Sequence, residues 1–204
     1  GEGGTAVVNA DDEGARTVLP FAAGATVVRY SASGADVEIR ARGVESDGRG
    51  SRFAVETADW GKAEISLPLI GAFNVENALC AAAVALAAGV DLERVAAALS
   101  TAPPVPGRMA TVDRGQPFAV VVDYAHTPAS LEKVLRLLRS LHPQRRLISV
   151  FGSAGERDVA KRPLQGSVAA RLADFSIFTS EDPRNEPAEA IVDEIAAGAL
   201  AVGA

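Results

Sequence analysis

Apolar and polar positions alternate along much of the first half of the chain, and short apolar runs stand between turn-forming residues. Runs at 6–9 and 25–30 predict two strands. Alternation then predicts three more strands, around Val37, Ile39 and Ala41, around Phe53 and Val55, and around Ile65 and Leu67. Turn-forming residues at 46–50 and 58–61 separate these three strands, so we expect antiparallel hairpins.

Beyond Gly71 the pattern becomes helical. Alanine, leucine and valine crowd the segment 77–88, which predicts a helix that packs closely against a neighbouring element. Gly89 would end this helix, and Asp91 would cap the next one, at 92–99.

In the second half of the chain, apolar strands alternate with helical segments. The predicted strands are two buried ones at 118–123 and 146–151 and a third at 174–179. The predicted helices lie at 128–141, 163–172 and 187–197. This alternation is typical of a parallel sheet covered by helices on both faces, and right-handed crossovers make it a Rossmann-like α/β domain. Ligands gather at the carboxyl ends of the strands in such sheets, so polar clusters that follow strands are the first candidates for a site.

The segment Pro103–Gly107 holds three prolines in five residues and predicts a stiff, non-helical connector. Charge differs on its two sides. Residues 1–106 carry 8 basic and 14 acidic side chains, whereas residues 107–204 carry 12 of each. We therefore expect two units, 1–106 and 107–204.

Composition narrows the function classes. The 204 residues are 48% hydrophobic and 23% charged, with a net charge of −6, so a basic nucleic-acid-binding face is not expected. No apolar run reaches the roughly 18 residues of a membrane span, and no signal peptide is visible. A single cysteine, Cys80, excludes an internal disulfide and fits a reducing compartment; we expect it in the core, and His142 exposed at a helix end. The sequence leads straight into a predicted strand and ends inside a helical pattern, which suggests a fragment.

Two polar clusters follow the first two predicted strands of the second half. In the segment 123–128, Asp123 could hold a ribose hydroxyl pair and His126 could contact a ligand; alternatively, Asp123 or Thr127 only caps the following helix. The segment 151–158 is a small-residue turn, and the cations Arg157, Lys161 and Arg162 come after its glycines. Such a turn lets backbone N–H groups approach an anion, although it is neither a Walker A loop nor a dinucleotide fingerprint. The alternative is a solvated loop with internal ion pairs.

The third cluster, 179–186, also follows a strand. Its carboxylates suit an ammonium group and Arg184 suits a carboxylate, so it could bind a zwitterion; alternatively, Asn185 caps the next helix. In the fourth cluster, Asn74 and Asn77 share one face of a helix turn and could pair with a base edge, unless Asn74 is a plain N-cap. Arg108, just past the connector, stands where it could reach between two domains.

Taken in order, these segments resemble the Mur ligases, the ATP-dependent amide-forming enzymes of peptidoglycan synthesis, and most closely the MurE type. That type adds a diamino acid to UDP-N-acetylmuramoyl-L-alanyl-D-glutamate. The matching segments are Asn9–Asp12, Gly71–Asn77, Pro106–Met109, Val122–Pro128 with Leu131–Lys133, Phe151–Gly152 to Arg157–Asp158 with Lys161–Pro163, and Glu181–Arg184.

The resemblance implies an α/β fold in two parts: the latter half of a central ATPase domain with a mixed sheet at 1–106, then a truncated Rossmann-like C-terminal domain at 107–204. The family's UDP-sugar domain, phosphate-binding loop, magnesium-binding acidic residue and carbamylated lysine would lie outside this sequence. So would its Gly-Lys-Gly-His-Glu stretch. We therefore expect no catalytic residue and no metal ligand here, and no ATP turnover by these residues alone.

The resemblance also implies roles for individual residues. ATP would be bound by Asn74, Asn77, Arg108, Asp123, Tyr124 and His126. The incoming amino acid would be bound by Arg157, Glu181, Asp182 and Arg184, with Lys161 near them. ATP and Mg²⁺ are the implied cofactors, UDP-muramoyl-dipeptide and a diamino acid the substrates, and the cytoplasm the location, without nucleic acid or membrane insertion. ATP would convert the D-glutamate carboxylate to an acyl phosphate, which the amine of the amino acid would attack.

One departure from the family pattern bears on the acceptor. Ligases that take meso-diaminopimelate usually read Asp-Asn-Pro-Arg where this chain reads Glu181-Asp182-Pro183-Arg184. Arg184 favours an acceptor with a distal carboxylate, whereas the added negative charge of Asp182 favours a distal ammonium, as in lysine or ornithine. The alternative functions for this chain are those of a MurF-type ligase, of folylpolyglutamate synthase, or of a non-catalytic module that binds a nucleotide or an amino acid.

Overall fold

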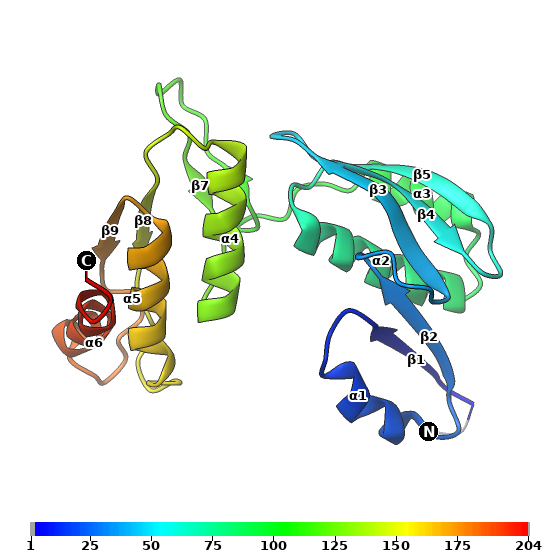
Figure 1. The fold of residues 1–204 in the computed structure, drawn as a ribbon, viewed down its shortest axis with the longest axis horizontal. Helices are drawn as coiled ribbons and strands as arrows, with labels where there is room; N and C mark the ends of the chain where they lie inside the picture. Colours follow the sequence, from blue (N-terminus) through cyan, green and yellow to red (C-terminus); the bar gives the residue numbers. More distant parts are fainter. Residues whose placement is uncertain (1–2, 204) are drawn as a thin grey trace. The chain divides into compact units, whose positions relative to one another are not determined.

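The protein is described by a computed structural model that covers residues 3–203 (Figure 1). The chain divides into two compact units, and the division falls between Thr111 and Val112. The proline-rich segment before it is non-helical at 102–105, as its sequence predicts. This division assigns Arg108 to the first unit.

The first unit is built on one five-stranded sheet in the order β1-β2-β3-β4-β5. Its strands are β1 (Thr5–Asn9), β2 (Thr26–Ser31), β3 (Ile39–Ser46), β4 (Ser51–Thr57) and β5 (Lys62–Leu67), with α1 (Ala15–Val18) and the 3-10 helix η1 (Leu19–Ala22) between the first two. β1, β2 and β3 pair in parallel, whereas β3, β4 and β5 pair antiparallel. The five predicted strands and the antiparallel hairpins are confirmed.

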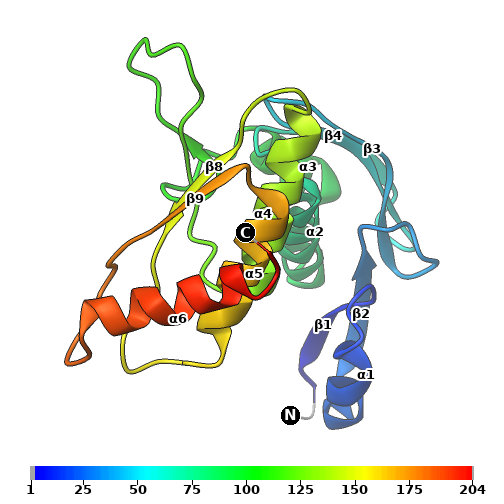
Figure 2. The same cartoon turned by 60° about the vertical axis from the view of Figure 1, so that its left-hand side comes forward.

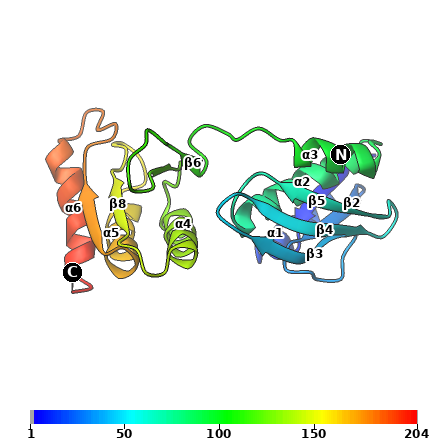
Figure 3. The same cartoon turned by 90° about the horizontal axis from the view of Figure 1, so that it is seen from above.

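Two helices cover this sheet: α2 (Ala72–Ala87) contacts β1 to β4, and α3 (Leu92–Ser100) contacts β5 (Figure 3). The small side chains of Ala78, Ala82 and Ala83 are buried in the core between helix and sheet, which explains the alanine-rich sequence. α2 begins directly after Gly71, as the change of pattern there predicts, and Gly71 with φ +99° is its N-cap. Gly89 adopts φ +85° just beyond the helix, as expected for a glycine that ends one.

The carboxylate of Asp11 joins the loops that follow β1 and β2. It accepts hydrogen bonds from the backbone of Ala32 (2.7 Å) and Ser33 (3.0 Å) and from the hydroxyls of Ser31 (2.7 Å) and Ser33 (2.6 Å). Burial raises the pKa of Asp11, but the hydrogen bonds from Ser33 and Ser31 outweigh it and leave the pKa below its usual value.

Replacing Asp11 by alanine is therefore expected to destabilise the first unit by about 2 kcal/mol, because several donors lose a charged acceptor. Since the folded pKa is depressed, this contribution is present above the unfolded pKa of about 3.9 and disappears as the pH falls through the folded value. Thermal unfolding of wild type and Asp11→Ala at neutral and acidic pH measures both effects. Asp59→Ala, at an exposed turn, is the matched control. An equal loss of stability in both variants would contradict the stabilising role of the Asp11 hydrogen bonds.

The second unit contains two parallel strands, β8 (Ile148–Phe151) and β9 (Phe175–Phe178). Three helices alternate with its strands, as predicted: α4 (Pro128–Leu141), α5 (Lys161–Leu172) and α6 (Ala188–Leu200). Leu131 and Leu135 of α4 and Val168 and Ala169 of α5 form the core, against which Phe151 and Phe178 pack edge to face with ring centroids 5.4 Å apart.

Two expectations about these strands are wrong. The segment 118–123 is not a buried strand: β7 covers only Val121–Val122, and Phe118 is 64% exposed. Among the described residues, β7 does not pair with the β8–β9 sheet, so most of this apolar run has no ladder to join. The remaining strand, β6 (Ala110–Thr111), is equally short.

The β8–β9 sheet is also not covered on both faces. Its inner face carries alternate residues, among them Ser149 and Ser176, whose hydroxyls lie 2.8 Å apart. The outward side chains Ile148, Val150, Phe175 and Ile177 are exposed, Val150 by 62%. The predicted buried strand at 146–151 is therefore buried on one face only within residues 3–203.

Candidate functional site

The loops that follow β8 and β9 lie against each other, and most of the predicted acceptor residues are on them. We name residues 152–160 the β8 loop and residues 179–187 the β9 loop. The backbone N–H of Gly155 donates to the carbonyl of Asp182 (2.8 Å), and the amide of Asn185 donates to the carboxylate of Glu156 (2.7 Å). The backbone N–H of Glu156 donates a further hydrogen bond to Glu186. The polar clusters that follow β8 and β9 therefore contact each other.

Glycine is required where the two loops approach most closely. A Cβ atom on Gly155 would lie 2.0 Å from the carbonyl oxygen of Pro183, and one on Gly152 would lie 2.3 Å from that of Thr179. Real side chains do not tolerate such distances to backbone atoms. The small-residue turn therefore serves loop-to-loop packing here, in addition to any anion that its N–H groups could meet.

The buried cation of this region is Arg162, in the first turn of α5, whose side chain is 1% exposed. Both of its terminal nitrogens donate to Glu186 at 2.9 Å, and one also donates to Glu194 at 2.9 Å. The hydrogen bonds from Arg162 lower the pKa of Glu186 to about 2, and those with Glu186 raise the pKa of Arg162 above its usual range. Both groups are therefore charged at neutral pH.

The four predicted acceptor residues are all exposed. Arg184 adopts a left-handed backbone conformation with φ +52°, and its Nε lies 3.6 Å from the carboxylate of Asp182. Neither Arg157 nor Glu181 has a hydrogen bond or ion pair with any other described residue. Two cations and two carboxylates are thus exposed on loops that contact each other, and groups of both signs are what an amino acid with charged ends requires.

The loop before α4 holds three of the predicted nucleotide residues. Asp123 accepts a hydrogen bond from the backbone of Ala125 (2.8 Å), and the rings of Tyr124 and His126 lie 4.9 Å apart. Both rings are exposed. Thr127 caps α4 in a reciprocal capping box with Ser130, which confirms the capping alternative for Thr127.

Lys161 connects this loop to α5. Its ammonium group donates to the carbonyl of His126 at 2.9 Å. Lys161 therefore contacts the loop after β7, which carries the predicted nucleotide residues. In the second unit, this loop, the β8 loop and the β9 loop are thus connected through the start of α5.

The remaining candidates lie in the first unit. Asn74 is not an N-cap: it is buried inside α2, and its amide donates to the carbonyl of Ile70 (2.8 Å). Asn77 is exposed and donates to the side-chain oxygen of Asn74 at 3.4 Å, so Asn77 is the member of the pair that a ligand can reach. Arg108 is also exposed.

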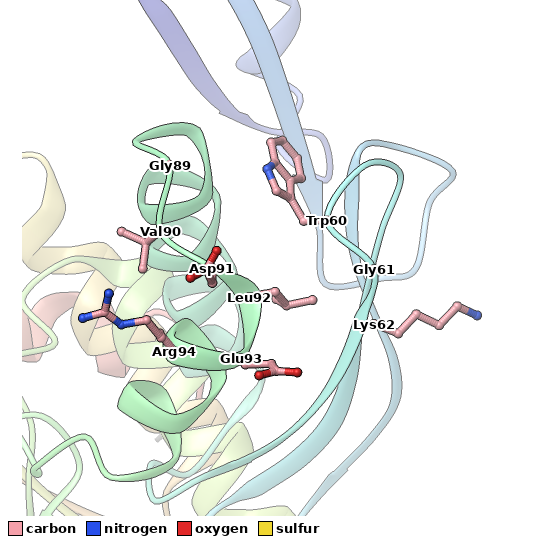
Figure 4. Close-up of a pocket in the computed structure, with 9 residues that line it drawn as sticks. All are labelled: Trp60, Gly61, Lys62, Gly89, Val90, Asp91, Leu92, Glu93 and Arg94. Atoms are coloured by element: carbon pink, nitrogen blue, oxygen red, sulfur yellow. The ribbon is translucent and has the colours of Figure 1, made fainter.

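An open hollow in the first unit does not coincide with any predicted site residue. It lies between the β4–β5 turn at Trp60 and the start of α3 at Asp91 (Figure 4). In that view the side chains of Lys62 and Arg94 extend in opposite directions rather than toward a common point. Within residues 3–203, no group of three or more metal-binding side chains comes together. Nor does any helix there have the length and apolar character to cross a membrane.

The sequence did not predict the pairing of Arg162 with Glu186. Arg162 was expected as one of three cations available to an anion, and Glu186 as a carboxylate of the cluster 179–186, but Arg162 is buried and paired with Glu186 and Glu194. A signal was present, because α5 opens with Lys161 and Arg162, and cations in a first helical turn oppose the helix dipole unless carboxylates pair with them. The expectation that Asn185 caps α6 is wrong, because Pro187 is the N-cap and Asn185 binds Glu156 instead.

Comparison with known proteins identifies the family. Residues 1–85 match the model of the Mur ligase middle domain, and residues 107–203 match that of the Mur ligase glutamate ligase domain. The chain belongs to the Mur ligase family. Membership confirms the resemblance described above and, with the structural neighbours below, the α/β fold class.

Among curated relatives, a UDP-N-acetylmuramyl-tripeptide synthetase of Roseiflexus sp. is 53% identical over 97% of this chain and 38% of its own length. A UDP-N-acetylmuramoyl-L-alanyl-D-glutamate--2,6-diaminopimelate ligase of Alkalilimnicola ehrlichii is 43% identical over 95% of this chain and 39% of its own length. The chain therefore spans about two fifths of the length of these relatives.

Solved structures agree in fold. A solved structure of a UDP-N-acetylmuramoyl-L-alanyl-D-glutamate--2,6-diaminopimelate ligase is 33% identical, with a TM-score of 0.58. The match covers 94% of this Mur ligase chain and 40% of that chain. Mycobacterium tuberculosis folylpolyglutamate synthase is 24% identical, with a TM-score of 0.76, over 96% of this chain and 43% of that chain. The second likeness shows the shared fold alone.

Proposed function

We propose that this Mur ligase chain works as part of a longer cytoplasmic ligase of the MurE type. That ligase forms an amide bond between UDP-N-acetylmuramoyl-L-alanyl-D-glutamate and a diamino acid, with ATP consumed. The relatives named above support the substrate class. The observation that carries the proposal is the hydrogen-bonded pair of β8 and β9 loops, on which Arg157, Glu181, Asp182 and Arg184 are all exposed.

In this proposal the second unit holds the acceptor amino acid. The guanidinium groups of Arg157 and Arg184 bind its carboxylates, and the carboxylates of Glu181 and Asp182 bind its ammonium group. Holding the acceptor so that its free amine faces the activated substrate speeds the reaction, because two reactants are then already in position. On this proposal, residues 1–106 belong to the ATPase domain and residues 107–204 to the acceptor domain.

ATP supplies the phosphoryl group that activates the substrate carboxylate. The exposed amide of Asn77 fits a base edge, the exposed rings of Tyr124 and His126 fit a stacking surface, and Asp123 fits a ribose. Arg108, an exposed cation, fits a phosphate. Among the described residues, no group of three or more metal-binding side chains comes together. On this proposal the ligands of Mg²⁺ lie in other parts of the longer ligase.

The pairing of Asp182 with Arg184 bears on which diamino acid is added. A carboxylate 3.6 Å from the guanidinium offsets part of its charge, which weakens attraction for a distal carboxylate and strengthens attraction for a distal ammonium. This supports lysine and ornithine, in addition to meso-diaminopimelate, as candidate acceptors.

The decisive experiment measures phosphate release by the full-length ligase that carries these residues. UDP-muramoyl-dipeptide and ATP are supplied with diaminopimelate, lysine, ornithine or alanine, the last as control. We expect release that depends on one of the three diamino acids. Release with none of them would overturn the proposal, and release with a folate substrate and glutamate instead would favour folylpolyglutamate synthase.

A further inference from the structure

We propose that Arg162 is a positioning residue for acceptor selection: through Glu186 it holds the β9 loop against the β8 loop and thereby sets the places of Asp182 and Arg184. The inference rests on the proposed function, because it concerns the same acceptor surface. It adds a residue that does not itself touch the acceptor.

The contacts of Arg162 reach every segment around the acceptor surface. From α5, its guanidinium binds Glu186 of the β9 loop through two hydrogen bonds of 2.9 Å. It also donates to the carbonyl of Ala154 in the β8 loop (3.4 Å) and to Glu194 of α6 (2.9 Å). One buried side chain thus connects both loops to two helices. A planar guanidinium suits this task because its donors have a fixed geometry.

Glu186 passes this constraint to the acceptor residues. Its carboxylate accepts from Arg162 and from the backbone N–H of Glu156, and its own backbone N–H donates to the carbonyl of Pro183 at 3.0 Å. Arg184 lies inside that turn. Both Arg184 and Glu156 have φ +52°, a conformation that residues other than glycine keep only where the surroundings impose it. The tie between Arg162 and Glu186 is such a constraint.

Arg162 is buried, whereas its carboxylate partners are not: the side chain of Arg162 is 1% exposed, and those of Glu186 and Glu194 are 30% and 43% exposed. A partly exposed ion pair contributes only modestly to stability, because water weakens the attraction. The expected role of these pairs is therefore to fix the positions of the loops.

The test uses the full-length ligase and compares Arg162→Met with Arg162→Lys and with the control Arg139→Met. Arg139 also forms an ion pair in the second unit, 2.7 Å from Asp174, but it contacts neither loop. We expect Arg162→Met to raise the KM for the acceptor at least tenfold and to reduce the preference between diaminopimelate and lysine. The KM for ATP should change less than twofold, Arg162→Lys should recover part of the loss, and Arg139→Met should behave as wild type.

A second pair of variants keeps the test decisive if Arg162→Met does not fold. Glu186→Gln and Glu194→Gln each remove one carboxylate partner of Arg162, but only Glu186 belongs to the β9 loop. We expect a raised acceptor KM for Glu186→Gln alone. Equal effects of these two variants, or an ATP KM that rises as much as the acceptor KM, would overturn the positioning role. Failure of the proposed function is distinguishable, because the wild-type enzyme would then show no acceptor-dependent phosphate release.

Discussion

Replacing Gly198 by alanine is expected to destabilise the second unit by about 1–3 kcal/mol, although the same change in an ordinary helix interior stabilises by about 1 kcal/mol. α5 and α6 cross in close contact (Figure 2). A Cβ atom on Gly198 would lie 1.9 Å from the carbonyl oxygen of Pro163, and one on Gly166 would lie 1.9 Å from that of Ile195. The two glycines therefore let the helix backbones approach each other directly.

Thermal or urea unfolding of the wild type and of Gly198→Ala measures this effect, and Gly166→Ala should behave alike. Gly48→Ala is the control, since a Cβ atom there would meet nothing within 4 Å. The sign of the change is diagnostic. A gain of stability in Gly198→Ala would show that the helices do not approach this closely.

Replacing Arg184 by glutamate is expected to weaken acceptor binding in the full-length ligase by about 10²-fold or more. The change removes the charge that binds a carboxylate and places a second negative charge within reach of Asp182; losing one partner of a charge pair costs about 2–5 kcal/mol. The KM for ATP should hardly change, because Arg184 lies on the β9 loop and the proposed nucleotide residues lie elsewhere.

Steady-state phosphate release at varied acceptor and varied ATP separates the two effects. Arg114→Glu, which changes the net charge equally at an exposed loop position, is the matched control. If Arg184→Glu raised both KM values alike, the division of labour between acceptor and nucleotide residues would be wrong.

The sequence predicted the elements well where one face of each is buried. Alternation located the strands of the first unit, and Gly89 marked the end of α2, because local burial and backbone preferences act within a few residues. It failed for 118–123, where an apolar run suggested a buried strand. Whether such a run is buried depends on a partner strand, which local patterns do not reveal.

The sequence by itself determined the fold class, the family, and the segments at strand ends that carry the acceptor and nucleotide candidates. Only the tertiary structure showed that α4, α5 and α6 leave one face of the β8–β9 sheet exposed and that Asn74 is buried and donates to the carbonyl of Ile70. The tertiary structure alone showed that Arg162 pairs with Glu186, which lies 24 positions further along the chain. The reason is physical: residue type and spacing determine what a segment can do locally, whereas pairing of distant charges and direct backbone contacts depend on how the elements pack.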